Sequence, residues 1–98
     1  MYNQTDLENN LKAIANHGDH YKFTMALNTL GQNDFQNISA YAYDAILCDL
    51  LNDHAQKGEH AVYSAIYVFF TVTKQFLPTK TKERTRNKLQ EFFGTDSL

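Results

Sequence analysis

Twelve consecutive residues, 61–72, read AVYSAIYVFFTV and carry no charge. Such a run suits a membrane span, a buried strand or the central helix of a small core. A membrane-spanning helix needs about 20 consecutive apolar residues, whereas Glu59 and His60 precede this run and Lys74 follows it. We therefore expect no membrane span, which leaves the strand and the helix.

The choice between strand and helix depends on what the rest of the chain offers as a partner. β-branched and aromatic residues favour a strand, but the sequence contains no second alternating run, and an unpaired strand leaves its backbone groups without hydrogen bonds. The segment 59–77 is also long for a strand and stops at Pro78, as a helix does. The run therefore predicts a helix buried at the centre of the fold.

Glycine and proline mark the ends of the other predicted helices. Both residues commonly follow helix ends, and they occur here at positions 18, 31, 58, 78 and 94. Apolar residues recur at helical spacing between them, which predicts helices over about 5–17, 20–30, 34–56, 59–77 and 79–93, with Thr5, Asp19 and either Thr79 or Thr81 as N-caps. We expect one all-α domain over residues 1–98, a compact antiparallel bundle of four to five helices.

Composition and cysteine usage indicate an ordinary globular protein. Apolar residues make up 43% of the chain and charged residues 20%, which is close to the globular average and far from disordered chains. Cys48 is the one cysteine, so no intramolecular disulfide can form, and MYNQTDLENN lacks the basic and apolar regions of a secretory signal. We expect a soluble protein of the reducing cytoplasm.

The reactive side chains form no catalytic, cofactor or metal signature. Gly18 breaks the helix between His17 and His20, and none of the four histidines falls in a known metal-binding motif. We expect Cys48 to lie buried among leucines of the third helix, where a thiol is inert. There is no nucleophile elbow and no glycine-rich phosphate loop, so we expect a non-enzymatic protein without a cofactor or a metal.

The best hint of function is an acidic surface that carries tyrosines. Residues 1–73 hold eight acidic and three basic side chains, a net charge of −5, which steers a basic partner toward the molecule. Tyrosine is favoured at interfaces because it offers rigid apolar area and a polar tip, although core packing is the commoner role for any single tyrosine. The residues assigned to this partner-binding surface are Asp44, Asp49, Asp53, Glu59, Tyr63 and Tyr67, with Tyr41 and Tyr43 nearby. They predict binding of a basic toxin or effector.

The alternative function is nucleic-acid binding by the last helix. Residues 74–98 hold six basic and three acidic side chains, a net charge of +3. Lys80, Arg84 and Lys88 recur four residues apart on one helical face, with Arg86 beside them, and such a face can contact phosphates. The segment lacks a helix-turn-helix pattern, so a solvated helix face is the commoner explanation.

Residues 66–94, IYVFFTVTKQFLPTKTKERTRNKLQEFFG, combine an aromatic-rich helix, a short turn and an amphipathic final helix. In this arrangement the chain resembles the small helical immunity proteins that protect bacteria from toxins, such as the enterocin-type four-helix bacteriocin immunity family. Immunity proteins of contact-dependent inhibition toxins are equally compatible. The resemblance implies a bacterial inhibitor of a toxin, and it assigns a role to no individual residue.

Overall fold

The computed structural model describes residues 4–30, 32–52 and 58–94. Within these ranges the chain forms five α-helices and two short 3₁₀ helices and contains no strand. The elements are α1 (Gln4–His17), α2 (His20–Asn28), η1 (Gln32–Phe35), α3 (Ala40–Leu51), α5 (Glu59–Thr73), η2 (Lys74–Phe76) and α6 (Thr79–Phe93). The prediction of an all-α helical bundle is confirmed.

The uncharged run forms most of α5, which is the central helix. α5 contacts α2, α3, α6 and both 3₁₀ helices. Its inner residues Val62, Ala65, Ile66 and Phe69 are completely buried and lie on one side because they follow the helical period. Burial of a large apolar side chain stabilises the fold by about 1.5–3 kcal/mol, so this helix supplies much of the core.

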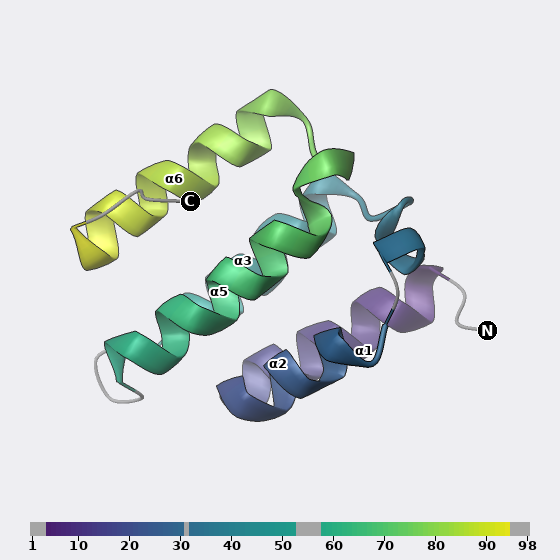
Figure 1. The fold of residues 1–98 in the computed structure, drawn as a ribbon, viewed down its shortest axis with the longest axis horizontal. Helices are drawn as coiled ribbons and strands as arrows, with labels where there is room; N and C mark the ends of the chain where they lie inside the picture. The colour runs from purple at the N-terminus through teal and green to yellow at the C-terminus, as the bar shows by residue number, and fades with distance from the viewer. Residues whose placement is uncertain (1–3, 31, 53–57, 95–98) are drawn as a thin grey trace.

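The helices are arranged in two layers (Figure 1). α5 lies in front of α3 and α2 lies in front of α1, while α6 packs at the edge against α3 and α5. Each helix runs opposite to the one before it. The molecule measures 37 × 28 × 19 Å, and its shortest dimension corresponds to two packed helices, each about 10 Å across.

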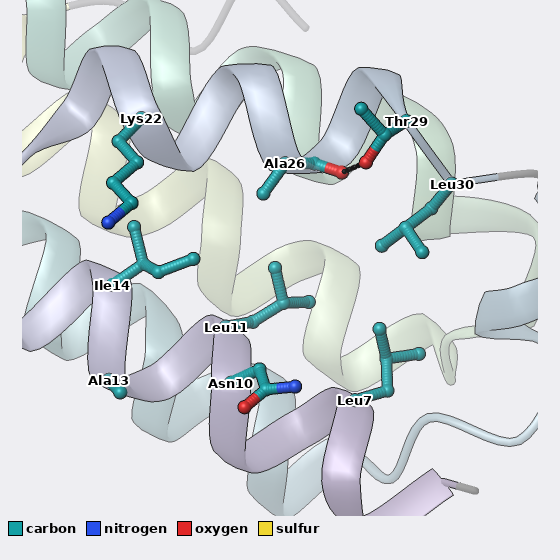
Figure 2. A pocket seen from close by; sticks show the side chains of 9 residues that line it. All are labelled: Leu7, Asn10, Leu11, Ala13, Ile14, Lys22, Ala26, Thr29 and Leu30. Carbon is teal, nitrogen blue, oxygen red and sulfur yellow. Dashed lines mark hydrogen bonds between the residues drawn. The ribbon is translucent and has the colours of Figure 1, made fainter. Parts of the chain in front are cut away.

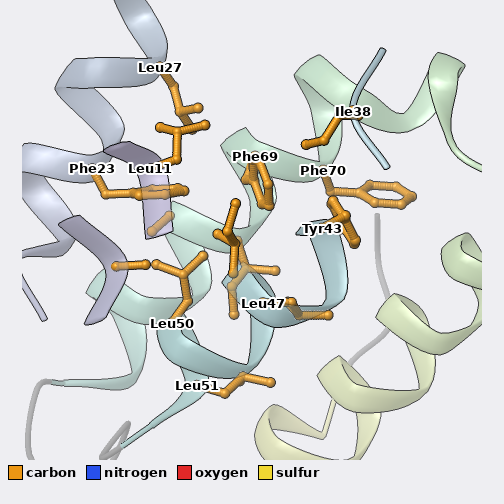
Figure 3. Close-up of a cluster of buried hydrophobic side chains, with 14 of the residues drawn as sticks. Leu11, Phe23, Leu27, Ile38, Tyr43, Leu47, Leu50, Leu51, Phe69 and Phe70 are labelled. Atoms are coloured by element: carbon orange, nitrogen blue, oxygen red, sulfur yellow. The ribbon is translucent and has the colours of Figure 1, made fainter. Parts of the chain in front are cut away.

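Three aromatic rings join the two layers. Phe69 of α5 stacks on Tyr43 of α3, with ring centroids 4.8 Å apart and planes at 17°, and it meets Phe23 of α2 nearly at right angles, at 5.4 Å and 83°. All three rings are completely buried, and Figure 3 shows them among the leucines of the core. Aromatic pairs of this kind contribute about 0.5–1.5 kcal/mol beyond their buried area, so Phe69 fixes α2 and α3 relative to α5.

Side-chain caps set the start of two helices. Asp19 accepts a hydrogen bond from the backbone N–H of Lys22 at 2.9 Å, which confirms the predicted N-cap of α2. The Ser39 hydroxyl accepts one from the backbone N–H of Ala42 at 3.0 Å and caps α3. Replacing such a cap by alanine costs about 0.5–2 kcal/mol, so both helix starts are fixed locally.

Two predicted helix starts are wrong. The third helix begins at Ala40 rather than near Asp34, because the 3₁₀ helix η1 and the Ser39 cap precede it. Thr5 lies inside α1 and is therefore not its N-cap. The Glu8 carboxylate accepts a hydrogen bond from the backbone N–H of Ser39 at 3.3 Å and links α1 to the start of α3.

His20 joins the turn between α1 and α2 to the end of α3. Its side chain is buried, with Nδ1 3.1 Å from the carbonyl oxygen of Gly18 and Nε2 3.0 Å from that of Leu50. Buried polar groups need such partners because an unsatisfied one is costly. His20 is therefore part of the core rather than an open ligand.

The inner face of α6 carries threonines, although its outer face is basic. Thr81 and Thr85 are buried. The Thr85 hydroxyl donates to the Thr81 carbonyl at 2.9 Å and lies 3.0 Å from the Tyr43 hydroxyl, which satisfies these polar atoms inside the core. α6 follows Pro78 without a side-chain cap, so neither Thr79 nor Thr81 is its N-cap.

Cys48 lies on the outer face of α3 and is exposed, so the expectation of a buried thiol is wrong. Leu47, which precedes Cys48, and Leu50, which follows it by two residues, are completely buried. Each residue advances the helix by about 100°, and position 48 therefore falls outside the face that α3 turns toward the core.

We expect Thr85→Val to lower the free energy of unfolding by about 1–3 kcal/mol, because it leaves the buried Tyr43 hydroxyl without its partner. Tyr43→Phe should cost less, about 1 kcal/mol. The double variant Tyr43→Phe/Thr85→Val should be close to Tyr43→Phe alone, because neither polar group is then left unpaired. Urea denaturation of the four proteins measures this coupling, and strictly additive losses would contradict the pairing.

Candidate functional site

A shallow hollow lies on the outer face of α5. Its volume is about 450 Å³, and it is lined by His60, Tyr63, Ser64, Tyr67 and Val68. These side chains share one face because their spacing follows the helical period. We name this feature the tyrosine hollow, after its two tyrosine rings.

The two rings of the tyrosine hollow are held by contacts along and between helices. Tyr63 and Tyr67 stack along α5 with centroids 6.5 Å apart and planes at 25°. Phe93 of α6 meets the Tyr63 ring nearly at right angles, at 5.6 Å and 85°. Tyr63 is consequently half-buried, whereas 47% of Tyr67 is exposed, so Tyr67 presents an ordered aromatic surface to solvent.

The tyrosine hollow faces away from α3. Tyr67 precedes Phe69 by two residues, or about 200° of helical turn, and Phe69 packs directly on Tyr43 of α3. α3 accordingly lies behind α5 in Figure 1. The acidic residues of α3 therefore do not share a face with Tyr63 and Tyr67, and the structure divides the predicted partner-binding surface in two.

Asp44, predicted to bind a partner, forms an ion pair within the molecule. Its carboxylate lies 2.7 Å from the guanidinium of Arg84 on α6, and Arg84 also donates to the Thr81 hydroxyl at 3.2 Å. The side chains of Asp44 and Arg84 are 33% and 49% exposed, so solvent screens the pair and its contribution to stability is at most about 1 kcal/mol. Asp44 of the predicted partner-binding surface is thus paired with Arg84 of the predicted nucleic-acid-binding face.

The structure describes the other three acidic residues of the predicted partner-binding surface to different extents. Asp49 is half-buried on α3, and its Oδ2 atom is buried and accepts no hydrogen bond from the described residues. Asp53 lies outside the described residues. Glu59 begins α5, and its side chain also lies outside the described part of the structure. Of this acidic set, the structure places the side chains of Asp44 and Asp49 only, and both belong to α3.

The two tyrosines of α3 point in different directions. Tyr41 is 83% exposed, whereas Tyr43 is a core residue. Burial raises the pKa of the Tyr43 phenol above its ordinary value; the negative charge of Asp44 acts in the same direction, and the hydrogen bond with Thr85 opposes both. Tyr43 therefore belongs to the core and is not available to a partner.

The predicted nucleic-acid-binding residues of α6 are only partly free. Lys80 is exposed and Lys88 is half-buried. The guanidinium carbon of Arg86 lies 5.7 Å from the centre of the Phe70 ring, within range of a cation–π interaction, and Arg84 pairs with Asp44. The two arginines thus help to hold α6 against α5 and α3.

No metal-binding cluster is found in the described ranges. Among these residues, no group of three or more histidine, cysteine and acidic side chains lies close enough to hold a metal ion. Both ring nitrogens of His20 face carbonyl oxygens, which leaves neither open as a ligand. None of the described helices is both long enough and apolar enough to cross a membrane.

Sequence reasoning missed three lining residues of the tyrosine hollow and the residue that supports it. His60, Ser64 and Val68 follow the same helical period as Tyr63 and Tyr67, so periodicity could have identified them. Phe93 lies 26 positions after Tyr67 in the sequence, and no local pattern connects it to α5. Its role emerges only from the packing of α6.

We expect the free energy of unfolding to fall as the pH rises above about 10, and to fall less steeply in Tyr43→Phe. The folded chain holds the Tyr43 proton more tightly than the unfolded chain, whose tyrosine pKa is about 10. The stabilisation is therefore complete below this pH and is lost above it, as the unfolded chain ionises first. Urea denaturation over a series of alkaline pH values measures the two slopes, and equal slopes would show that Tyr43 does not titrate differently in the folded state.

Comparison with known proteins assigns no family to this bundle. No protein family, no curated protein and no solved structure matches the chain. Its function must therefore be inferred from its own residues and their geometry.

Proposed function

We propose that the chain is a non-enzymatic protein-binding domain and that the tyrosine hollow is the centre of its binding surface. The observation that carries this proposal is the exposure of Tyr67, 47%, on a ring that stacks against Tyr63. Because Phe93 supports Tyr63 from the side, little conformational freedom is lost when a partner covers the pair. Ordered aromatic side chains of this kind dominate the energy of protein interfaces.

The proposed partner is a basic protein, namely a toxin or effector that the chain neutralises in the cytoplasm by covering its active surface. The net charge of −5 over residues 1–73 supports this choice, because opposite charge speeds encounter and favours the correct partner. Asp44 is already paired with Arg84, so in this proposal the acidic residues act mainly through their long-range field. Tyr63 and Tyr67 make the direct contact.

The resemblance of residues 66–94 to helical immunity proteins supports the same class of function. In the structure this segment contains the second half of α5, the turn at Pro78 and the whole of α6. Two lining residues of the tyrosine hollow, Tyr67 and Val68, fall within this segment, as does Phe93, which supports Tyr63. In this proposal the helical pair provides the rigid base on which the aromatic contact surface is held.

The partner is identified by co-purification of the full chain from its native host with mass spectrometry, and by inspection of the adjacent gene. Binding of the purified partner is then measured by calorimetry. We expect Tyr67→Ala to weaken binding about 30-fold or more, because a central aromatic residue at an interface is worth about 2 kcal/mol or more.

Tyr41→Ala is the matched control for that experiment. Tyr41 is 83% exposed and lies on α3, whereas the tyrosine hollow is lined by α5, so its removal should leave the affinity within about twofold of the wild type. Equal losses in the two variants, or no loss in Tyr67→Ala, would show that the tyrosine hollow is not the contact surface.

The alternative proposal is that α6 binds nucleic acid, and the exposed Lys80 at the start of α6 is the observation that favours it. Phosphate contacts make affinity fall steeply with salt concentration.

If α6 binds DNA or RNA, Lys80→Gln/Lys88→Gln should weaken binding and reduce the salt dependence by about two phosphate contacts. Neither lysine pairs with an acidic residue in the described structure, so the double variant should fold normally. A salt-independent affinity, or one unchanged in the double variant, would eliminate this function.

A further inference from the structure

A second hollow lies between α1 and α2, away from the tyrosine hollow. Its volume is about 300 Å³, and Figure 2 shows the apolar side chains of the two helices pointing toward one another across it. The floor and walls are formed by Leu7, Leu11, Ile14, Ala26 and Leu30. We name this feature the α1–α2 groove. It exists because the small side chain of Ala26 stands opposite the larger ones of α1 and leaves the space between the helices unfilled.

Of the polar side chains that line the α1–α2 groove, Thr29 is paired, because its hydroxyl donates to the Ala26 carbonyl oxygen at 2.8 Å. Lys22 extends from α2 toward Ile14 at one end of the groove, and Asn10 lies on the α1 side (Figure 2). Among the described residues, the Lys22 ammonium forms no ion pair and no hydrogen bond. The Asp19 carboxylate nearby accepts the backbone N–H of Lys22 instead. The α1–α2 groove is therefore lined by apolar side chains along its length and has the positively charged Lys22 at one end.

The size of the α1–α2 groove favours a narrow occupant over a protein segment. An α-helix with its side chains is about 10–12 Å across, and a stable protein interface buries about 800 Å² on each side. The groove volume of about 300 Å³ lies instead at the lower end of the range of small-molecule sites, about 300–1,000 Å³. An unbranched hydrocarbon chain is narrower than a helix and therefore suits a space of this volume better.

We propose that the α1–α2 groove binds a small amphiphile that has an unbranched apolar chain and an anionic head, with a medium-chain fatty carboxylate as the ligand class. The chain lies over the half-buried side chains of Ile14, Ala26 and Leu30, where it removes their exposed apolar surface from water. Leu7 and Leu11 are already buried and form the floor beneath it. The carboxylate lies at Lys22, whose ammonium supplies the charge-assisted hydrogen bond. Asn10 offers an amide N–H on the opposite, α1 side of the groove.

Titration of the full chain with dodecanoate, kept below the concentration at which it forms micelles, tests this proposal by calorimetry and by NMR of isotopically labelled protein. We expect saturable one-to-one binding, with amide shifts confined to α1 and α2. Decanoate should bind about 15-fold more weakly than dodecanoate, because each methylene removed from the apolar contact costs about fourfold in affinity. Absence of saturable binding, or shifts spread over the whole bundle, would overturn the proposal.

Three variants separate the roles of charge and groove. Lys22→Gln should weaken dodecanoate binding about fivefold, the amount expected for one exposed charge interaction, and leave the binding of dodecanol unchanged. Lys12→Gln is the matched control, because Lys12 is exposed on α1 and does not line the groove. Ala13→Phe, at an exposed lining position, should block both ligands without disturbing the core.

Equal effects of Lys22→Gln and Lys12→Gln would contradict the assignment of the carboxylate to Lys22. Binding that survives Ala13→Phe undiminished would contradict the location in the groove. Tyr67→Ala should leave dodecanoate binding unchanged, because Tyr67 lies on α5 and does not line the α1–α2 groove. Failure of this proposal is therefore distinguishable from failure of the proposed protein binding.

Discussion

The contact of Phe69 with two other aromatic rings is the interaction on which the arrangement of this bundle depends. Phe69 meets Phe23 of α2 on one side and Tyr43 of α3 on another, and the Tyr43 hydroxyl reaches Thr85 of α6. One continuous series of buried contacts thus passes through α2, α5, α3 and α6. Because rings pack only in a few orientations, this series fixes how each helix is rotated about its own axis.

The rotation of the helices decides which side chains a partner can reach. With Phe69 turned toward α3, Tyr67 faces solvent on the opposite side of α5, and with Tyr43 in the core, Cys48 lies on the outside of α3. The same rotation brings Asp44 to Arg84. The acidic surface and the basic face of α6 were predicted as alternative binding sites, but Asp44 of the first forms an ion pair with Arg84 of the second. This pair lowers the net charge that either surface offers to a partner.

The two surfaces to which we assign binding differ in shape and in chemistry. The tyrosine hollow is shallow, lies on a single helix and is supported by Phe93, as suits a broad contact with another protein. The α1–α2 groove is smaller, lies between two helices and ends at Lys22, as suits a small amphiphile. They are formed by different helices, so occupation of one leaves the side chains of the other free.

Local sequence patterns were enough to predict the all-α fold, the central place of residues 61–72 and the starts and ends of several helices. Asp19 caps α2 as predicted, and Gly94 ends α6 with a φ of 71°, because caps and glycine conformations depend on residues only a few positions apart. The start of α3, the exposure of Cys48, the pairing of Asp44 and the support of Tyr63 by Phe93 were decided only by the tertiary structure. Each of these depends on which helix lies beside which and at what rotation, and that is set by packing between residues far apart in the chain.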